Sequence, residues 1–491
     1  MSRRVYIETV GCQMNMLDSE LLAARLGEIG YQVVDERRKA DTILFNTCSV
    51  RQHAEDKIYS ALGRLKNLKE QRPGTIIGVL GCMAQREGET ILRRAPHVDL
   101  VVGPGRIVRL PELIEQVERG EGPLVERSLD RRGHAQAEVA STYAQLDAPR
   151  PTELRPGTHQ AYVRAMFGCD QFCTYCIVPS VRGPEQSRPA GEIEREVRRL
   201  VDQGCIEVTL LGQAVNRYRD HSKGSELRLA DLLARLDRIT GLRRLRFVTN
   251  HPKYMTDELI TAVAELPSVC PYLHVPAQHG SDRILRRMNR GYSAAYYREL
   301  VERIRQAIPA DESGLGAAVT SDFIVGFPGE TDEEFAATVE LVHWARFKNS
   351  FIFKYSPRPG TQAAERLPDD VPEPVKRQRN NALLDAQNAV SLADNQRLVG
   401  RCVEVFVEGP SKATQKQNQD DPAATPDRTT PDRTTPDRTT LALLEADRPM
   451  QLVGRTRRDR IVVFDAPRQL IGRLVPVTID KADACTLFGT I

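Results

Sequence analysis

The sequence lacks a long hydrophobic run, and no apolar stretch approaches the ~18 residues that a membrane-spanning helix requires. It also lacks the pattern of a secretory signal peptide, because the apolar stretch near its start is short and is interrupted by Glu8. An excess of charge of one sign is missing too: the formal net charge of the 491 residues is +3, which neither favours nor excludes a nucleic-acid partner. We therefore expect a cytoplasmic protein without a membrane segment, in which any basic surface is local.

Cysteine, in contrast, is well represented, with ten residues. In the reducing compartment expected here, grouped thiols are more often metal ligands or catalytic groups than disulfides. The chain is also longer than the roughly 250–300 residues at which single hydrophobic cores stop growing, so about two to four domains are expected. The fold class is α/β, as the following segments indicate.

Residues 1–118 predict a small parallel sheet covered by helices, an αβα domain. Short runs rich in β-branched residues alternate with segments such as LDSELLAARLGEIG, in which apolar residues recur at helical spacing. Strands that alternate with helices in this way form a parallel sheet. The expected strands are 4–10, 41–47, 75–81 and 98–103.

Residues 119–155 are polar and rich in Pro, Gly and charge, which predicts a linker. From 156 to 392 the alternation resumes with longer helices, and its six strand–helix units predict an open parallel sheet or a partial (β/α)6 barrel. Active sites of such folds lie at the carboxyl ends of the strands. The expected strands are 161–167, 206–212, 244–249, 270–275, 317–326 and 350–355, and the expected helices are 190–203, 227–239, 256–265, 292–307 and 331–346.

Beyond residue 395 short β-like runs replace the helical pattern, which predicts a small antiparallel β-barrel over 395–475 and a C-terminal tail over 476–491. A low-complexity insertion, 411–440, interrupts this barrel. Within it, TPDRTTPDRTTPDRTT (425–440) repeats a five-residue unit without an apolar side chain. Such a segment buries too little surface to offset its ordering entropy, so a disordered hairpin insertion is expected.

Three cysteines lie far apart in the first domain but at equivalent points of its pattern. Cys12, Cys48 and Cys82 each follow an expected strand, in ETVGC, LFNTC and VLGC. Since parallel strands joined by right-handed crossovers end at the same sheet edge, we expect the three thiols to converge there. Burial as a small hydrophobic side chain is the alternative for any one of them, but three equivalent positions favour a shared metal site. The remaining cysteines show no such relation: Cys205, Cys270, Cys402 and Cys485.

A second trio, Cys169, Cys173 and Cys176, follows the first strand of the central domain in the pattern C-x3-C-x2-C. Iron and zinc thiolate sites usually take four ligands, so one position is left open. Zinc is not excluded by ligand count, because HVPAQH supplies His274 and His279. A structural zinc site usually pairs two short Cys/His units, however, and here only one is present, which favours an iron–sulfur cluster.

The second trio resembles the signature of the radical S-adenosylmethionine (radical SAM) superfamily, in which the open iron of a [4Fe-4S] cluster binds S-adenosylmethionine (SAM). Further segments occur in the order typical of the methylthiotransferases of that superfamily: NTCSVRQHAEDK, GCMAQR, GCDQFCTYCIVPSVRGPEQSR, LLGQAVNRY, GSDRILRRMNRGY, DFIVGFPGET and YSPRPGT. The resemblance covers nearly the whole chain and includes a terminal domain similar to the TRAM β-barrel. The departures, AQHGS, LLGQAVN, VPS and the TPDRT repeat, replace none of the six cysteines.

The resemblance implies a tRNA-modifying enzyme with two [4Fe-4S] clusters and SAM. NTCSVR, CMAQ and LLGQ favour the branch that adds a methylthio group to carbon 2 of N(6)-dimethylallyladenosine at position 37, beside the anticodon; sister branches act on threonylcarbamoyladenosine or on an aspartate of a ribosomal protein. In this family one SAM yields the radical that removes the hydrogen, and a second methylates a sulfur carried by the auxiliary cluster at Cys12, Cys48 and Cys82. A reducing donor such as flavodoxin or ferredoxin is implied, and a monomer is expected.

Contacts to SAM and RNA are expected from a few further residues. The resemblance implies that Tyr175 contacts the adenine of SAM. Gln213 follows an expected strand at the same carboxyl edge of the central domain, so it is a second expected SAM contact. The alternatives are a packed aromatic ring for Tyr175 and a capping amide for Gln213. Arginine pairs well with phosphate, and small β-barrels often bind RNA. RILRRMNR (283–290) is either an RNA contact or a solvated charged face. The RNA-binding set expected from GRTRRDR in the terminal barrel is Arg455, Arg457, Arg458 and Arg460.

Two further classes stay open beside the methylthiotransferase. One is a zinc-bound RNA-binding protein without catalysis, and the other is an electron-transfer protein, which the long αβ region disfavours because a relay does not need it. Metal analysis separates the first from an enzyme with two iron–sulfur clusters.

Overall fold

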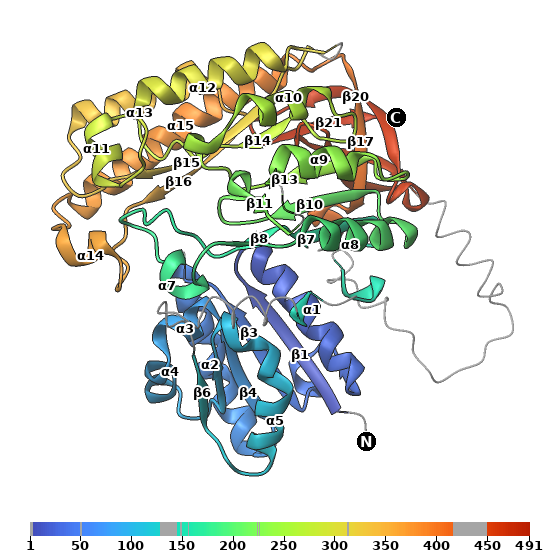
Figure 1. Ribbon diagram of the computed structural model, residues 1–491, viewed down its shortest axis with the longest axis vertical. Coiled ribbons are helices and arrows are strands. Elements are labelled where there is room, and N and C mark those ends of the chain that lie inside the picture. The colour runs from blue at the N-terminus through green and yellow to red at the C-terminus, as the bar shows by residue number, and fades with distance from the viewer. Residues whose placement is uncertain are drawn as a thin grey trace, which may run out of the picture.

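The computed structural model describes residues 3–49, 52–127, 145–147, 150–155, 157–222, 224, 226–311, 314–415 and 449–491. They form three parts in chain order (Figure 1). The N-terminal domain, in blue, lies against one side of the central domain, and the C-terminal barrel, in red, lies against another side. The predicted α/β class is thereby confirmed, while residues 416–440 of the predicted insertion lie outside the described residues.

The N-terminal domain is a six-stranded parallel sheet in the order β2-β1-β3-β4-β5-β6. The central strands β3 and β4 are buried along their whole length, as expected for a parallel sheet with both faces covered. Apolar residues of α1 and α5 pack on one face, and those of α2, α3 and α4 pack on the other. The elements are β1 Arg3–Val10, α1 Gln13–Glu28, β2 Tyr31–Val33, β3 Thr42–Thr47, α2 Gln52–Gln71, β4 Ile76–Gly81, α3 Cys82–Glu87, α4 Glu89–Arg94, β5 Leu100–Val102, α5 Leu110–Glu118 and β6 Leu124–Glu126.

The four predicted strands of this domain correspond to β1, β3, β4 and β5, but the sequence did not indicate β2 or β6. Each has three residues and lies at an edge of the sheet, and so short a run carries little periodic signal. β6 pairs in parallel with β5. Because β6 lies inside the segment 119–155, the prediction that this whole segment is a linker is wrong, and the domain extends to residue 126.

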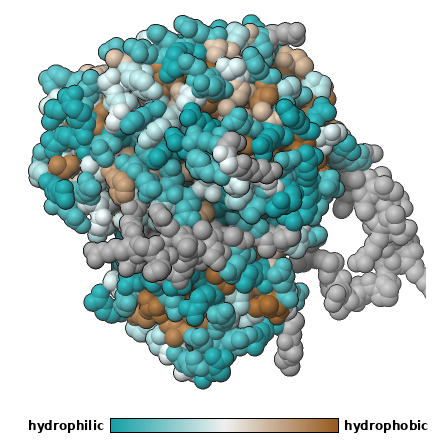
Figure 2. Space-filling view, viewed as in Figure 1, coloured by the Kyte–Doolittle hydropathy of each residue, from teal (hydrophilic) through white to brown (hydrophobic). Residues whose placement is uncertain are grey.

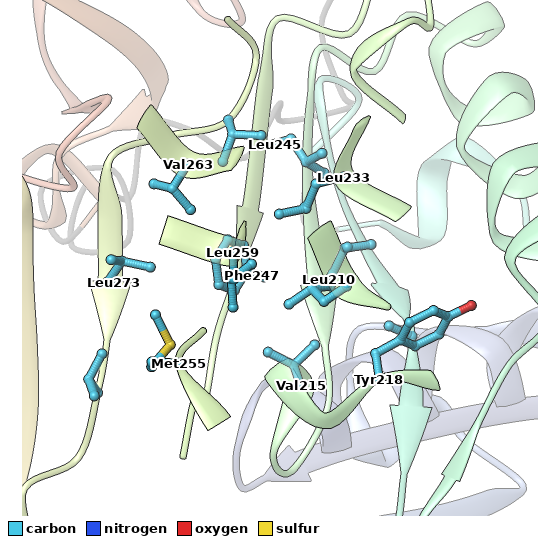
Figure 3. Close-up of a cluster of buried hydrophobic side chains, with 14 of the residues drawn as sticks. Leu210, Val215, Tyr218, Leu233, Leu245, Phe247, Met255, Leu259, Val263 and Leu273 are labelled. Atoms are coloured by element: carbon cyan, nitrogen blue, oxygen red, sulfur yellow. The ribbon is translucent and has the colours of Figure 1, made fainter. Parts of the chain in front are cut away.

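The central domain contains two three-stranded parallel sheets, β13-β10-β7 and β14-β15-β16, joined by a parallel bridge between Leu245 and Val269. Figure 3 shows part of its core, where Leu210 and Phe247 of neighbouring strands meet Leu259 of α10. The main elements are β7 Gln160–Arg164, α8 Ala190–Asp202, β10 Glu207–Leu211, α9 Leu229–Asp237, β13 Arg244–Phe247, α10 Asp257–Glu265, β14 Tyr272–His274, α11 Asp282–Arg287, α12 Ala294–Ala307, β15 Ala318–Val325, α13 Asp332–Ala345, β16 Asn349–Lys354, α14 Gln362–Arg366 and α15 Glu373–Gln396. Shorter pieces are β8 Met166–Phe167, α7 Val178–Arg182, β9 Gln186–Ser187, β11 Arg219–Asp220 and β12 Leu227–Arg228. The six predicted strands and five predicted helices are all present.

The C-terminal domain is a closed five-stranded barrel in the order β17-β18-β19-β21-β20 around an apolar interior. The predicted barrel is confirmed, but its predicted end at residue 475 and the tail over 476–491 are wrong, since most of β20 and all of β21 lie beyond that point. β20 closes the barrel by pairing with β17, and β21 pairs with β19 and β20. The run RLVPVTID has the apolar and polar alternation of a half-buried strand, but the predicted boundary falls inside it. The strands are β17 Cys402–Pro410, β18 Pro449–Thr456, β19 Ile461–Pro467, β20 Leu474–Ala482 and β21 Thr486–Thr490.

The N-terminal and central domains share part of one apolar core. Phe167 and Leu211 of the central domain belong to the same cluster as Leu17 and Leu21 of α1. On the face shown in Figure 2 hydrophilic residues predominate and apolar ones occur in scattered groups. Among the described helices, none has the length and apolar character needed to cross a lipid bilayer.

Candidate active site

The loop after β8 gathers Cys169, Cys173 and Cys176. It begins at Gly168, whose φ is +67° and where a Cβ would lie 1.9 Å from a backbone oxygen, so the turn requires glycine. The amide of Cys169 donates to the carbonyl of Gly183 at 3.1 Å, and the amide of Cys176 donates to that of Cys173 at 3.0 Å. The charge of Cys173 acts on both other thiols. The structure therefore brings this trio together.

The surroundings of this trio suit an anionic metal cluster. Burial raises the pKa of Cys169 to about 11 and that of Cys176 to about 12, so a bound metal has to displace their protons. A cation is already in place, because Arg290 Nη1 donates to Cys173 Sγ at 3.1 Å. Among the described residues, the groups that act on the buried Arg290 are tyrosines and Cys173, not carboxylates. A buried cation requires a negative partner, which an iron–sulfur cluster held by these thiolates would supply.

The two histidines that could complete a zinc site make other contacts. Within the described ranges, no three His, Cys, Asp or Glu side chains lie close enough together to surround a single metal ion. His279 is buried and contacts Glu330 at 2.7 Å, and His274 contacts Thr320 at 3.0 Å. In an iron–sulfur cluster, by comparison, the thiolates bind different irons and stand further apart.

The other trio, Cys12, Cys48 and Cys82, lies at the carboxyl ends of three neighbouring strands, β1, β3 and β4. A hydrogen bond with Cys48 lowers the pKa of Cys12 to about 6, and the charge of Cys12 acts on Cys82. Burial raises the pKa of the Cys82 thiol, on which the charge of Arg182 acts. The three thiols thus converge as the sheet topology predicts, and they also face a buried guanidinium. Their donor set and this charge fit a second iron–sulfur cluster.

One cavity of about 570 Å³ separates the two trios. Cys12 lines it from the N-terminal domain and Cys176 lines it from the central domain. Its volume is typical of small-molecule sites, which span roughly 300–1,000 Å³. Tyr175 and Gln213, the residues expected to contact SAM, both line this cavity.

A second cavity, of about 480 Å³, extends from the first toward the C-terminal barrel. The two share Gln13, Val248 and Thr249 as lining residues. At its other end Glu408 and Arg455 of the barrel contribute to the lining. The space between the trios therefore continues through the interior of the central domain.

Comparisons with known proteins agree with this arrangement. Three family models match: one described as "Uncharacterized protein family UPF0004" over residues 4–103, the radical SAM superfamily over 163–342, and the TRAM domain over 439–491. The tRNA-2-methylthio-N(6)-dimethylallyladenosine synthase of Rhodopirellula baltica is 50% identical over 491 residues, which cover 100% of this chain and 96% of the relative. The synthase of the same name from Moorella thermoacetica is 42% identical and covers 98% of this chain and 97% of the relative.

The chain belongs to the family of tRNA-2-methylthio-N(6)-dimethylallyladenosine synthases. The resemblance to the radical SAM methylthiotransferases is thereby confirmed, and the zinc-protein and electron-transfer alternatives are set aside. Among solved structures, the radical SAM methyltransferase TsrM from Kitasatospora setae is similar over 74% of this chain and 75% of that one, with a TM-score of 0.53 and 16% identity. At this identity the likeness shows the fold alone.

In this member of the synthase family, the four arginines expected to bind RNA lie where the TRAM barrel meets the central domain. Their acceptors belong to the protein: Arg455 pairs with Glu408 and Asp459, Arg457 donates to the carbonyls of Pro267 and Val269, Arg458 to Gly316 and Asp311, and Arg460 to Asn395. Two arginines of the central domain reciprocate, since Arg244 and Arg246 donate to barrel carbonyls. GRTRRDR therefore helps to dock the barrel through Arg457, Arg458 and Arg460, while RNA binding by these arginines stays a prediction.

Two arginines that lie near the cysteine trios were not predicted from the sequence. Arg182 lies beside Cys82, and Arg358 lines the cavity next to the Cys48 region, where the charge of Cys48 acts on it. Both belong to the quoted motifs GCDQFCTYCIVPSVRGPEQSR and YSPRPGT. A single arginine within such a motif has no periodic pattern, so only the folded arrangement reveals which trio it serves.

Cys12 is expected to be the first of the six thiols to react with iodoacetamide in metal-free synthase at neutral pH. With a pKa of about 6 it is largely thiolate and it is accessible, whereas Cys169 and Cys176 are held as thiols by pKa values of about 11 and 12. A rate advantage on the order of tenfold or more is expected. Peptide mass spectrometry over time measures it, with the exposed Cys402 as reference thiol, and acidification to pH 5 should slow Cys12. Faster labelling of Cys169 would contradict this assignment.

Proposed function

We propose that this protein adds a methylthio group to carbon 2 of N(6)-dimethylallyladenosine in tRNA. The observation that carries the proposal is the single cavity bounded by Cys12 of one trio and Cys176 of the other. A reaction that removes a hydrogen and delivers a sulfur to the same carbon requires both centres to open onto one chamber. The names of the relatives supply the substrate, and the sequence resemblance supplies position 37.

The six cysteines are the proposed ligands of the two iron–sulfur clusters. When bound, SAM and these clusters would supply the electron, the radical chemistry and the sulfur that a C–H bond without an acidic proton requires. The trio at Cys169, Cys173 and Cys176 would hold the cluster that binds SAM. The trio at Cys12, Cys48 and Cys82 would hold the auxiliary cluster.

The remaining work of the chain is to position the reactants and keep water away. The Tyr175 ring meets Phe327 edge-on, with 6.4 Å between centroids, which fixes its orientation at the cavity wall. Gln213 follows β10 and offers an amide to the same space. Apolar side chains such as Leu211, Val248 and Ile324 line the cavity and help to exclude water from the reacting bond.

We further propose that the anticodon stem-loop of tRNA is bound with the help of the TRAM domain. Because Arg457, Arg458 and Arg460 are engaged with the central domain and Arg455 is paired within the barrel, other residues of the barrel would contribute to this role. A reducing donor such as flavodoxin or ferredoxin would supply electrons to a monomeric protein. Since tRNA is the proposed substrate, we expect the reaction to take place in the cytoplasm.

Nucleoside mass spectrometry of tRNA tests this function directly. A strain without the gene should accumulate N(6)-dimethylallyladenosine and lack its 2-methylthio derivative, and the wild-type gene should restore it. Accumulation of unmodified threonylcarbamoyladenosine, or loss of a ribosomal protein modification, would point to a sister branch instead. An unchanged modification profile would overturn the proposal.

A further inference from the structure

Arg290 is a buried cation whose place does not depend on the cysteine that it contacts. Its Nε donates to the Tyr292 hydroxyl at 3.0 Å, and its Nη2 donates to the carbonyl of Pro276 at 3.3 Å. The guanidinium carbon also lies 5.4 Å from the centroid of the Tyr292 ring. These contacts hold the guanidinium from one side. The third nitrogen, Nη1, is left to donate to Cys173 Sγ at 3.1 Å. Tyr292 and Pro276 therefore hold the positive charge of Arg290 next to the Cys173 sulfur, and neither contact involves Cys173.

Arg182 is likewise a buried cation beside a cysteine, Cys82 of the auxiliary trio. It ends the short helix α7, which follows the Cys176 loop and lies at the junction of the N-terminal and central domains (Figure 1). Ile177 and Val181 pack on Cys82, which places Arg182 of the same helix beside this cysteine, where its charge acts on the thiol. Its Nη2 is held by Asp18 of α1 at 3.0 Å. The auxiliary trio of the N-terminal domain thus receives a neighbouring cation from the central domain.

We propose that Arg290 and Arg182 are positioning residues that separately raise the reduction potentials of the two clusters, Arg290 through Cys173 and Arg182 through Cys82. The proposal rests on the proposed function, because it assigns the two trios to iron–sulfur clusters. Hydrogen bonds to cluster sulfurs, net charge and solvent exposure are the means by which a protein sets such potentials. Both arginines act in one direction: reduction adds negative charge, which a buried guanidinium stabilises.

Arg290 and Arg182, both of the central domain, would therefore each set the reduction potential of a different cluster. Each guanidinium acts on cysteines of one trio, Arg290 on Cys173 and Cys176 and Arg182 on Cys82 and Cys12. A charge acts most strongly on the nearest centre. Loss of Arg290 should make the cluster at Cys169, Cys173 and Cys176 harder to reduce. Loss of Arg182 should do the same to the auxiliary cluster alone.

The test measures the two potentials separately in the full-length protein. Cys12, Cys48 and Cys82 are replaced together by alanine to leave only the SAM-binding cluster, and Cys169, Cys173 and Cys176 are replaced together to leave only the auxiliary cluster. Arg290→Met and Arg182→Met are introduced into each background, and redox titrations are followed by electron paramagnetic resonance. Arg283→Met is the matched control, because Arg283 is an exposed arginine of the same MNRGY-containing segment that pairs with Glu334.

Each arginine variant is expected to shift its own cluster by a factor of ten or more in the reduction equilibrium, which is 59 mV for a one-electron couple. The other cluster and the Arg283→Met protein should stay unchanged. Arg290→Lys and Arg182→Lys, which keep the charge, should recover part of the shift. Equal potentials in all variants with normal cluster loading would overturn the inference, as would a shift of both clusters by either variant. Absence of iron from the parent backgrounds would instead refute the proposed function.

Discussion

Replacing Cys173 by alanine is expected to abolish both the methylthiolation of tRNA and the cleavage of SAM. Cys173 is the thiol whose charge acts on Cys169 and Cys176, and it is the one that Arg290 contacts. A trio that already leaves one metal position open cannot lose a further ligand and still hold a cluster. We expect activity to fall on the order of a thousandfold or more, equivalent to roughly 4 kcal/mol of transition-state stabilisation.

Two companion variants make this result specific. Cys205→Ala removes a thiol that is buried in the central core and donates to the Glu207 carbonyl at 3.2 Å, away from the cavity, and should keep full activity. Cys12→Ala should lose the methylthio product but continue to form 5′-deoxyadenosine from SAM. Chromatography of 5′-deoxyadenosine and mass spectrometry of nucleosides measure both steps. Methylthiolated tRNA from the Cys173→Ala protein would contradict the assignment of the SAM-binding trio.

The positions of the six cysteines could be predicted because each depends on a strong local signal. A buried parallel strand such as TILFNT or TIIGVLG is a continuous apolar run, and the residue after it must lie at the carboxyl edge of the sheet. Topology then brings Cys12, Cys48 and Cys82 to one place without knowledge of any side-chain contact. The compact second trio requires even less, because one loop contains it.

The partners of the arginines could not be predicted in this way. Arg290 and Arg460 occur in charged segments that look like solvated surface, yet both are buried. What decides their role is an acceptor far away in sequence: the Cys173 sulfur for Arg290 and the Asn395 side chain for Arg460. A local charge pattern shows that arginines are clustered, but it does not indicate which distant element packs over them and buries them. The three-residue strand β6 was missed for a related reason, since its pairing with β5 determines it rather than its own sequence.

Asp18 is expected to be the side chain whose loss most weakens the attachment of the N-terminal domain. It accepts from Arg164 Nη2 at 2.9 Å and from Arg182 Nη2 at 3.0 Å, and all three side chains are almost completely buried. Arg164 keeps a second carboxylate, Asp147, at 3.3 Å. Asp18→Ala removes the carboxylate that joins the buried guanidinium groups of Arg164 and Arg182, and with it an ion pair between the two domains. Breaking such a buried pair costs about 3–5 kcal/mol.

Urea unfolding and limited proteolysis at the domain junction measure this loss. Asp35→Ala is the matched control in the same domain, because Asp35 is exposed and only distantly paired with Lys39, at 4.0 Å; its effect should stay within about 0.5 kcal/mol. Asp18→Leu combined with Arg182→Met removes both charges and should recover much of the stability, since apolar replacement of a buried pair is often neutral. If Asp18→Ala unfolds at the same urea concentration as Asp35→Ala, the pairing with Arg182 does not hold the domains together. A double variant no more stable than Asp18→Ala would show that the carboxylate acts through something other than this cation.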